Sequence, residues 1–216
     1  MVRAILWDND GVLVDSEHLY FEASRDALRE VEVDLTLDLF RDVNLRQGRS
    51  CFDLARDEGI DDERIQHIRA DRDARFRARV RQGVDLMDGV IETLTHLHGR
   101  HPMAIVTSSH PDNLRTMHRD HAIDHFFEFV LAQGDYARSK PHPDPYLMAA
   151  ERLGVEPAQC VVVEDSPRGL ESAIRAGMPC LVVPNELTRA GDFSAATRVL
   201  GSIREVPGEV AALSLC

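Results

Sequence analysis

The chain has 216 residues, of which 44% are hydrophobic and 29% charged, a composition typical of a water-soluble globular protein with one good-sized domain, or a compact domain with an insertion. Its formal net charge of −12 argues against nucleic acid as the main partner, because binding DNA or RNA begins with a basic surface. No apolar run approaches the ~20 residues that span a bilayer, so we expect a cytoplasmic protein without a membrane partner.

A short apolar run at 2–7 leads into the sequence Asp8-Asn9-Asp10-Gly11. The run predicts a buried β-strand. Residues i and i+2 of an extended strand point the same way, so Asp8 and Asp10 are expected to face one spot. Two carboxylates that share a site repel each other unless a cation or a proton is present. Residues 8–10 therefore predict a site that binds a cation or holds a proton.

Residues 17–82 carry a helical pattern. Apolar residues recur there at spacings of three to four, and no part of the stretch alternates like a strand. Breaks at Asp34, at 46–49 and at 59–61 divide the stretch into about four helices. We therefore expect a helical insert between the first strand and the rest of the chain.

From residue 83 onward, helices alternate with short apolar strands, the pattern of a parallel sheet with both faces covered. The expected strands are 103–106, 129–131, 160–163, 180–183 and 198–200. The expected helices are 89–98, one that follows Asp112, one from Asp144 as the N-cap to Gly154, and one from Ser166 to Gly177. The fold class is therefore α/β.

Chemistry in an open parallel sheet gathers beyond the carboxyl ends of the strands. Those ends carry acids, hydroxyls and one lysine: Asp8 and Asp10 after the first strand, Thr107-Ser108-Ser109 after 103–106, Lys140 after 129–131, and Glu164-Asp165-Ser166 after 160–163. Lys140 is the only lysine of the chain, beside 24 arginines. We expect these side chains to converge.

Such a set fits phosphoryl chemistry. A hard divalent cation relieves crowded carboxylates, and Mg²⁺ suits this role because it also takes a substrate phosphate as a ligand. Asp8 would attack phosphorus and form an aspartyl phosphate, while Asp10 would protonate the leaving oxygen and deprotonate the attacking water. Thr107 and the amides after it would hold the phosphoryl oxygens. Lys140 would place a positive charge between the nucleophile and the phosphate.

Four segments resemble the four motifs of the haloacid dehalogenase superfamily: 8–17, Thr107, Ser139-Lys140-Pro141 and 164–169. The match extends over nearly the whole chain. It implies a Rossmann-like parallel-sheet core, residues 1–15 and 83–216, with a small α-helical cap domain, residues 16–82, inserted after the first strand. The chain is most similar to the phosphatase and β-phosphoglucomutase-like branch, because dehalogenases and phosphonate-cleaving members lack the aspartate found here as Asp10.

The resemblance implies roles for individual residues. It makes Asp8 the nucleophile and Asp10 the acid/base, whose backbone carbonyl also helps to hold Mg²⁺. The implied carboxylate ligands of Mg²⁺ are Asp8, Glu164 and Asp165, and the implied contacts of the phosphoryl group are Thr107 and Lys140.

Further candidates for substrate binding lie near these motifs. Ser108 and His110 follow Thr107 closely, in or just after the loop that is expected to hold the phosphoryl oxygens. In capped members of the family a glycine-containing cap loop reads the leaving group, which makes Arg46 and Arg49 candidates for a second anionic or hydroxyl-rich part of the substrate. Mg²⁺ is the only cofactor expected.

The predicted function is hydrolysis of a small phosphorylated metabolite, a sugar phosphate or similar polyol phosphate, by a monomer or weak homodimer. One alternative is a phosphosugar mutase that resembles β-phosphoglucomutase. Similar sequences often have histidine where this chain has Tyr20, which disfavours mutase activity. The other alternative is a non-enzymatic phospho-switch like the receiver modules of signalling proteins. Receivers carry the acidic pair and the phosphoacceptor on different strands, so the alternation of Asp8 and Asp10 favours the enzyme.

Overall fold

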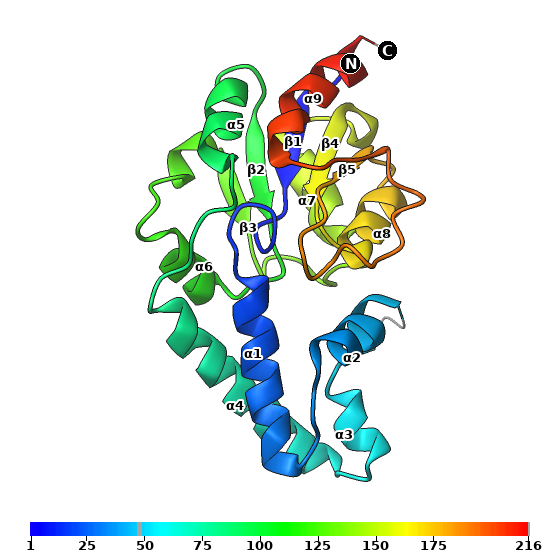
Figure 1. Ribbon diagram of the computed structural model, residues 1–216. Coiled ribbons are helices and arrows are strands. Elements are labelled where there is room, and N and C mark those ends of the chain that lie inside the picture. The colour runs from blue at the N-terminus through cyan, green and yellow to red at the C-terminus, as the bar shows by residue number, and fades with distance from the viewer. Residues whose placement is uncertain (47–48, 216) are drawn as a thin grey trace.

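A six-stranded parallel β-sheet forms the centre of the larger part of the molecule (Figure 1). The computed structural model describes the backbone of residues 1–46 and 49–215, and the side chains of all of these except Leu45 and Arg46. The strand order β3-β2-β1-β4-β5-β6 makes β1 central. The strands are β1 (Ala4–Trp7), β2 (Met103–Val106), β3 (Phe129–Leu131), β4 (Cys160–Glu164), β5 (Cys180–Val182) and β6 (Arg198–Val199). All neighbouring pairs are parallel, which confirms the predicted α/β class.

Helices cover both faces of this sheet, because successive side chains of a strand point to opposite sides. Ile5 and Trp7 of β1 belong to the apolar cluster packed with α5 (Val90–Leu97) and α9 (Val206–Ser214). Ala4 and Leu6 belong to the cluster packed with α7 (Asp144–Leu153) and α8 (Pro167–Arg175). All four β1 side chains are fully buried. Close packing on both faces fixes the strand that carries Asp8 and Asp10 at its end.

The chain between β1 and β2 forms a helical segment that extends away from the sheet (Figure 1). Its α-helices are α1 (Glu17–Leu28), α2 (Leu37–Arg41), α3 (Asp53–Asp57) and α4 (Asp62–Val80), and a π-helical turn, Asp42–Arg46, follows α2. Buried residues give the segment an apolar cluster of its own, which includes Leu28, Leu35, Phe52, Ile65 and Ile68. Within the described part of residues 17–82, these four α-helices agree with the prediction of about four.

The two connections between this segment and the sheet run side by side. The amide of Asp15 donates to the carbonyl of Asp85 (2.9 Å), and the amide of Met87 donates to the carbonyl of Leu13 (3.0 Å). From these connections α1 and α4 extend together, while both chain termini lie at the opposite end of the molecule (Figure 1). Among the described residues, no helix combines the length and the apolar character needed to cross a membrane.

The start of α7 differs from the prediction. Pro143 is the N-cap residue, and Asp144 is the first residue of the helix rather than its cap. The Asp144 carboxylate instead accepts two hydrogen bonds from the guanidinium of Arg138 (2.8 and 3.0 Å). Gly154 ends the helix in the left-handed conformation, with φ = 66°, as predicted.

Two other helices also differ from the prediction. α6 (Pro111–His118) begins at Pro111, and its N-cap His110 accepts a hydrogen bond from the amide of Asp112. No helix was predicted where α9 lies, and its Pro207 stands in the first turn, where a helix tolerates proline. Short 3₁₀ turns occupy Arg29–Val31, Asp124–Phe126, Pro157–Gln159 and Ile203–Glu205.

Candidate active site

Asp8 lies directly after β1, at the carboxyl end of the sheet. Its amide donates to the carbonyl of Val163 in β4 (2.9 Å), which fixes its backbone, and its side chain is buried. Gly11 then turns the chain with φ = 77°, a conformation that favours glycine. A Cβ at residue 11 would lie 2.4 Å from Asp165 Oδ2. Glycine therefore allows the end of β1 to approach Asp165 closely.

Lys140 lies between two of the acids. Its ammonium donates to Asp8 Oδ1 (2.6 Å), to Glu164 Oε1 (2.7 Å) and to the carbonyl of Val106 (2.9 Å). The residue is only 5% exposed, and its Nζ lies 4.9 Å from the ring centre of Tyr146. Burial lowers the pKa of a lysine, but the charges of Asp8 and Glu164 outweigh this and raise the pKa of Lys140. The ammonium is therefore charged at neutral pH.

Glu164, at the end of β4, has no exposed surface and uses both of its oxygens. Oε1 accepts from Lys140 and from the hydroxyl of Tyr146 (2.8 Å). Oε2 accepts from the amides of Asp165 (3.1 Å) and Ser166 (3.3 Å) and from the Ser166 hydroxyl (3.0 Å). Burial raises the pKa of Glu164, but the charge of Lys140 and these hydrogen bonds hold it below its usual value. Glu164 is therefore a fixed anion.

Hydroxyl groups hold the carboxylate of Asp10. Oδ2 accepts from Thr107 Oγ1 (3.0 Å) and Ser109 Oγ (2.8 Å), and Oδ1 accepts from Ser16 Oγ (2.6 Å). The hydroxyl of Thr107, which is fully buried, also accepts from the amide of Ser109 (3.0 Å). The structure thus places the loop after β2 against the end of β1. A hydroxyl can donate to a carboxylate or accept from a carboxylic acid, so this setting suits both protonation states of Asp10.

The site holds more negative charge than Lys140 can balance. Burial raises the pKa of Asp8 well above its ordinary value, which the charge of Lys140 only partly offsets. Burial likewise raises the pKa of Asp165 well above its ordinary value, and the charges of Glu17 and Glu164 add to the effect. Such a cluster is stable only with bound protons or with a further cation.

The donor set fits a hard cation. Asp8, Glu164 and Asp165 each offer a carboxylate oxygen, and these oxygens lie within 4.8 Å of one another. Asp165 Oδ2 also accepts from Asn185 Nδ2 (2.7 Å). Within the described part of the chain, Asp8 Oδ2 and Asp165 Oδ1 accept no hydrogen bond, whereas both oxygens of Glu164 are engaged. Asp8 and Asp165 are thus the carboxylates most available to a metal ion.

Three of the other predicted substrate-binding residues, Ser108, His110 and Arg49, do not join this hydrogen-bonded cluster. Ser108 is exposed next to Thr107, and His110 is exposed as the N-cap of α6. Arg49 forms ion pairs with two carboxylates of α3 (2.6 and 3.8 Å). The side chain of Arg46 lies outside the described residues.

Four residues that the structure places in the site were not predicted: Ser16, Glu17, Tyr146 and Asn185. Burial and the negative charge of Asp10 raise the pKa of Glu17, the first residue of α1, to about 7. Tyr146 of α7 donates a hydrogen bond to Glu164, and Asn185, which follows β5, donates one to Asp165. Glu17 is the last residue of the first motif segment, 8–17, a signal that could have marked it. Tyr146 and Asn185 carry no such signal.

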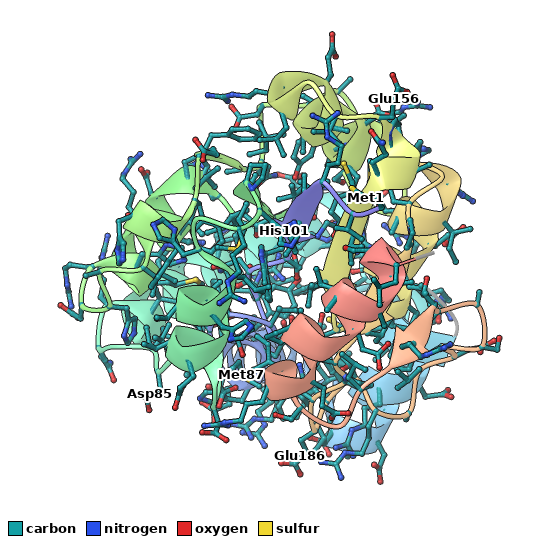
Figure 2. All side chains as sticks on the ribbon, turned by 90° about the horizontal axis from the view of Figure 1, so that it is seen from above. Met1, Asp85, Met87, His101, Glu156 and Glu186 are labelled. Carbon is teal, nitrogen blue, oxygen red and sulfur yellow. The ribbon has the colours of Figure 1, made fainter. Side chains whose placement is uncertain are left out.

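The helical segment also contacts the rest of the molecule near the site. Arg41, the last residue of α2, donates through Nη2 to the carbonyl of Glu186 (2.8 Å). Figure 2, seen from above, shows Glu186 at the edge of the molecule near the blue ribbon of the helical segment. Glu186 is the neighbour of Asn185, so this contact connects α2 with the loop that holds Asp165.

Comparison with known proteins supports the reading of these motifs. The family model described as "Haloacid dehalogenase-like hydrolase" matches residues 5–183. Hexitol phosphatase A of Escherichia coli (strain K12) is 34% identical over 191 residues, which cover 84% of this chain and 82% of that protein. Fructose-1-phosphate phosphatase YqaB of the same organism is 29% identical over 187 residues, 83% of this chain and 95% of that protein. The crystal structure of CbbY from Rhodobacter sphaeroides in complex with phosphate has a TM-score of 0.78 and 27% identity, and covers 95% of this chain and 96% of that one. The chain belongs to the haloacid dehalogenase-like hydrolases.

Proposed function

We propose that this protein is a Mg²⁺-dependent phosphatase that transfers the phosphoryl group of a small phosphorylated metabolite to Asp8 and then to water. The observation that carries the proposal is the position of Lys140. Its buried ammonium binds one oxygen of Asp8 (2.6 Å) and leaves the other free to attack. A fixed positive charge beside the nucleophile stabilises the charge that develops on the phosphoryl oxygens.

The residues support a two-step reaction. In the first step, the free oxygen of Asp8 bonds to phosphorus, the bond from phosphorus to the leaving oxygen breaks, and Asp10 gives that oxygen a proton. In the second step, Asp10 takes a proton from water, the water oxygen bonds to phosphorus, and phosphate leaves as the Asp8 carboxylate is restored. The hydroxyls of Ser16, Thr107 and Ser109 hold Asp10 in place for both proton transfers.

The carboxylate of Asp165, the backbone carbonyl of Asp10 and the oxygen of Asp8 that does not attack phosphorus are the groups that would hold Mg²⁺. Mg²⁺ supplies positive charge to the phosphoryl oxygens and relieves the repulsion among the carboxylates. Glu164 acts as a positioning residue, because its oxygens are engaged by Lys140, Tyr146 and the start of α8. It keeps the ammonium of Lys140 beside Asp8.

We further propose that residues 16–82 act as a cap domain on a core formed by residues 1–15 and 83–216. The separate apolar cluster of the helical segment and its two adjacent connections support this division. A helical cap encloses a small molecule rather than a macromolecule. A sugar or polyol phosphate is the proposed substrate class, supported by the relatives that are named for fructose 1-phosphate and hexitols.

Tyr20 favours hydrolysis over a mutase reaction. The ring of Tyr20 packs edge-on against that of Phe76, with 5.7 Å between the ring centres. The guanidinium carbon of Arg72 lies 4.5 Å from the centre of the Tyr20 ring. Burial raises the pKa of Tyr20 above its usual value. A phenol fixed in this way is poorly suited to move protons on a sugar, as a residue at this position of the cap would have to do in a mutase.

The test is a panel of phosphomonoesters with Mg²⁺: fructose 1-phosphate, sorbitol 6-phosphate, glucose 1-phosphate, glycerol 3-phosphate and the generic p-nitrophenyl phosphate. Free phosphate and isomerised product are measured in the same samples, with Asp8→Asn as the inactive control. We expect phosphate equal to the substrate consumed. Isomerised product without phosphate would establish the mutase, and turnover that persists in Asp8→Asn would exclude the mechanism.

A further inference from the structure

A basic groove follows the seam between α4 of the helical segment and α6 of the sheet region. It has a volume of about 510 Å³. Its lining includes Arg77 and Arg81 at the end of α4, Arg115 and Arg119 at the end of α6, and Asp112 and Thr116. The proposed reaction assigns no role to this groove, and among the candidate site residues whose side chains the structure describes, only the exposed His110 reaches it.

The spacing of the arginines directs them into the groove together. Residues four apart share a helix face, which places Arg77 with Arg81 on α4 and Arg115 with Arg119 on α6. The neighbouring side chains Phe76, Val80 and Met117 are buried in one apolar cluster. That cluster holds the two helices against each other, so the two arginine pairs remain face to face.

The charge of the groove is not balanced within the chain. Among the residues that the structure describes, Arg77 and Arg81 have no side-chain partner, whereas neighbouring arginines of α4 are paired, as Arg79 is with Asp26 (2.5 Å). Of the four guanidinium groups that line the groove, Arg115 pairs with Asp112 and Arg119 with Asp120 (2.8 Å), which leaves the two on α4 uncompensated. In a chain with a net charge of −12, two unpaired guanidinium groups that face two others across a groove mark a candidate anion site.

We propose that the basic groove binds a small polyanion with two or more phosphate groups, which bridges α4 and α6. Guanidinium groups bind phosphate oxygens through pairs of hydrogen bonds, and arginines on both sides need phosphates at both ends of the ligand. The volume is that of a small-molecule site. Apart from the imidazole of His110, the described lining contains no aromatic and no aliphatic side chain, so an acyl chain would gain nothing there.

The bridge has a structural consequence. It ties α4 of the helical segment to α6, which begins directly after the loop that carries Thr107 and Ser109. A bound polyanion therefore stabilises the arrangement of the two parts seen in this structure. The groove residues differ from Asp8, Lys140 and Asp165, so loss of polyanion binding and loss of phosphatase activity can be measured separately.

The test is a titration with inorganic tripolyphosphate in EDTA at low ionic strength, followed by calorimetry and by the melting temperature Tm. EDTA excludes complexes of the probe with divalent cations, and low salt avoids screening of the exposed charges. We expect tripolyphosphate to bind the native protein and raise its Tm. Arg77→Gln/Arg81→Gln should weaken binding at least tenfold and abolish the rise in Tm, while Mg²⁺-dependent phosphate release in the absence of tripolyphosphate is unchanged.

The matched control is Arg3→Gln/Arg198→Gln, which removes the same charge from exposed positions outside the groove and should bind like the native protein. Arg115→Gln/Arg119→Gln, on the opposite wall, should repeat the loss. Equal binding by the groove variants, or an equal loss in the control, would overturn the proposal. So would orthophosphate binding as tightly as tripolyphosphate, or single-stranded DNA binding more tightly.

Discussion

The carboxylate of Glu164 occupies the space that a side chain at Gly169 would need. A Cβ built on Gly169 would lie 1.8 Å from Glu164 Oε1. The same Oε1 accepts from the ammonium of Lys140 (2.7 Å), which also binds Asp8. The absence of a side chain at Gly169 in α8 thereby fixes where the ammonium of Lys140 lies beside Asp8, the proposed nucleophile.

Gly169→Ala should damage both stability and activity. The added methyl group displaces a fully buried anion, and such overpacking costs about 1–3 kcal/mol, more than the roughly 1 kcal/mol that alanine gains over glycine in a helix. We expect a lower free energy of unfolding in urea and a loss of kcat/KM of at least about tenfold, because Lys140 shifts with Glu164. Gly208→Ala in α9 is the control, since nothing lies within 4 Å of a Cβ there. Native stability and activity of Gly169→Ala would contradict this account of Glu164.

Asp10→Asn should separate the two proton transfers. Asparagine keeps the shape of the side chain but moves no proton, so turnover of sugar phosphates should fall about 10²–10⁴-fold. p-Nitrophenyl phosphate has a leaving oxygen that needs no proton, and its first step should survive. Rapid mixing should then show a burst of nitrophenolate of about one equivalent per site, followed by slow turnover. Equal losses for both substrates, with no burst, would argue against Asp10 as the acid/base.

Mg²⁺ should stabilise the protein at neutral pH, because it neutralises the surplus carboxylates of the site. At a concentration one hundred times its Kd, a ligand specific for the folded state adds about 2.7 kcal/mol. We expect Asp165→Asn to reduce the rise in Tm caused by Mg²⁺, and to lower Mg²⁺ affinity in the activity assay. Asp192→Asn, at an exposed position, serves as the control. An unchanged response in Asp165→Asn would remove Asp165 from the ligand set.

Glu17 should make the metal-free protein less stable as the pH rises. Its pKa is raised to about 7 in the folded state, mainly by burial and then by the charge of Asp10, whereas an unfolded chain releases this proton near pH 4.3. Between these values the folded state binds more protons, so this group lowers the free energy of unfolding by up to about 1.4 kcal/mol per pH unit. Above pH 7 its contribution is constant.

Urea unfolding in EDTA at pH 5, 6 and 7 measures this effect. Glu17→Gln should flatten the decline in stability over that range, and Glu63→Gln, at an exposed position of α4, should leave it as in the native protein. An identical decline in the native protein and in Glu17→Gln would show that Glu17 does not hold the proton.

The central strands were predictable from sequence, because a short apolar run that is buried on both faces, such as 160–163, has few alternatives in a chain of this pattern. The meeting of Asp8, Thr107 and Lys140 was predictable as well, since the carboxyl ends of parallel strands share one edge of the sheet. Single proline and glycine residues were less informative about where helices begin and end. Pro207 resembles a turn signal, yet it lies in the first turn of α9.

The rest of the site depends on contacts between segments that are distant in sequence. Asn185 reaches Asp165 only because the loop after β5 folds back over the end of β4, and the position of Tyr146 depends on the packing of α7 against the sheet. The direction in which α1 leaves the first motif decides whether Glu17 faces the acids or solvent. No periodicity or spacing in the sequence encodes these distances.

The most direct test of the central claim is to trap the phosphoryl group on the enzyme. The protein is mixed with Mg²⁺ and the ³²P-labelled form of its fastest substrate, quenched in acid within milliseconds, digested, and the labelled peptide is sequenced. We expect label on Asp8 that forms and decays at rates consistent with kcat, and no label in Asp8→Asn. Full turnover without label on Asp8, or label on another residue, would contradict the proposed mechanism.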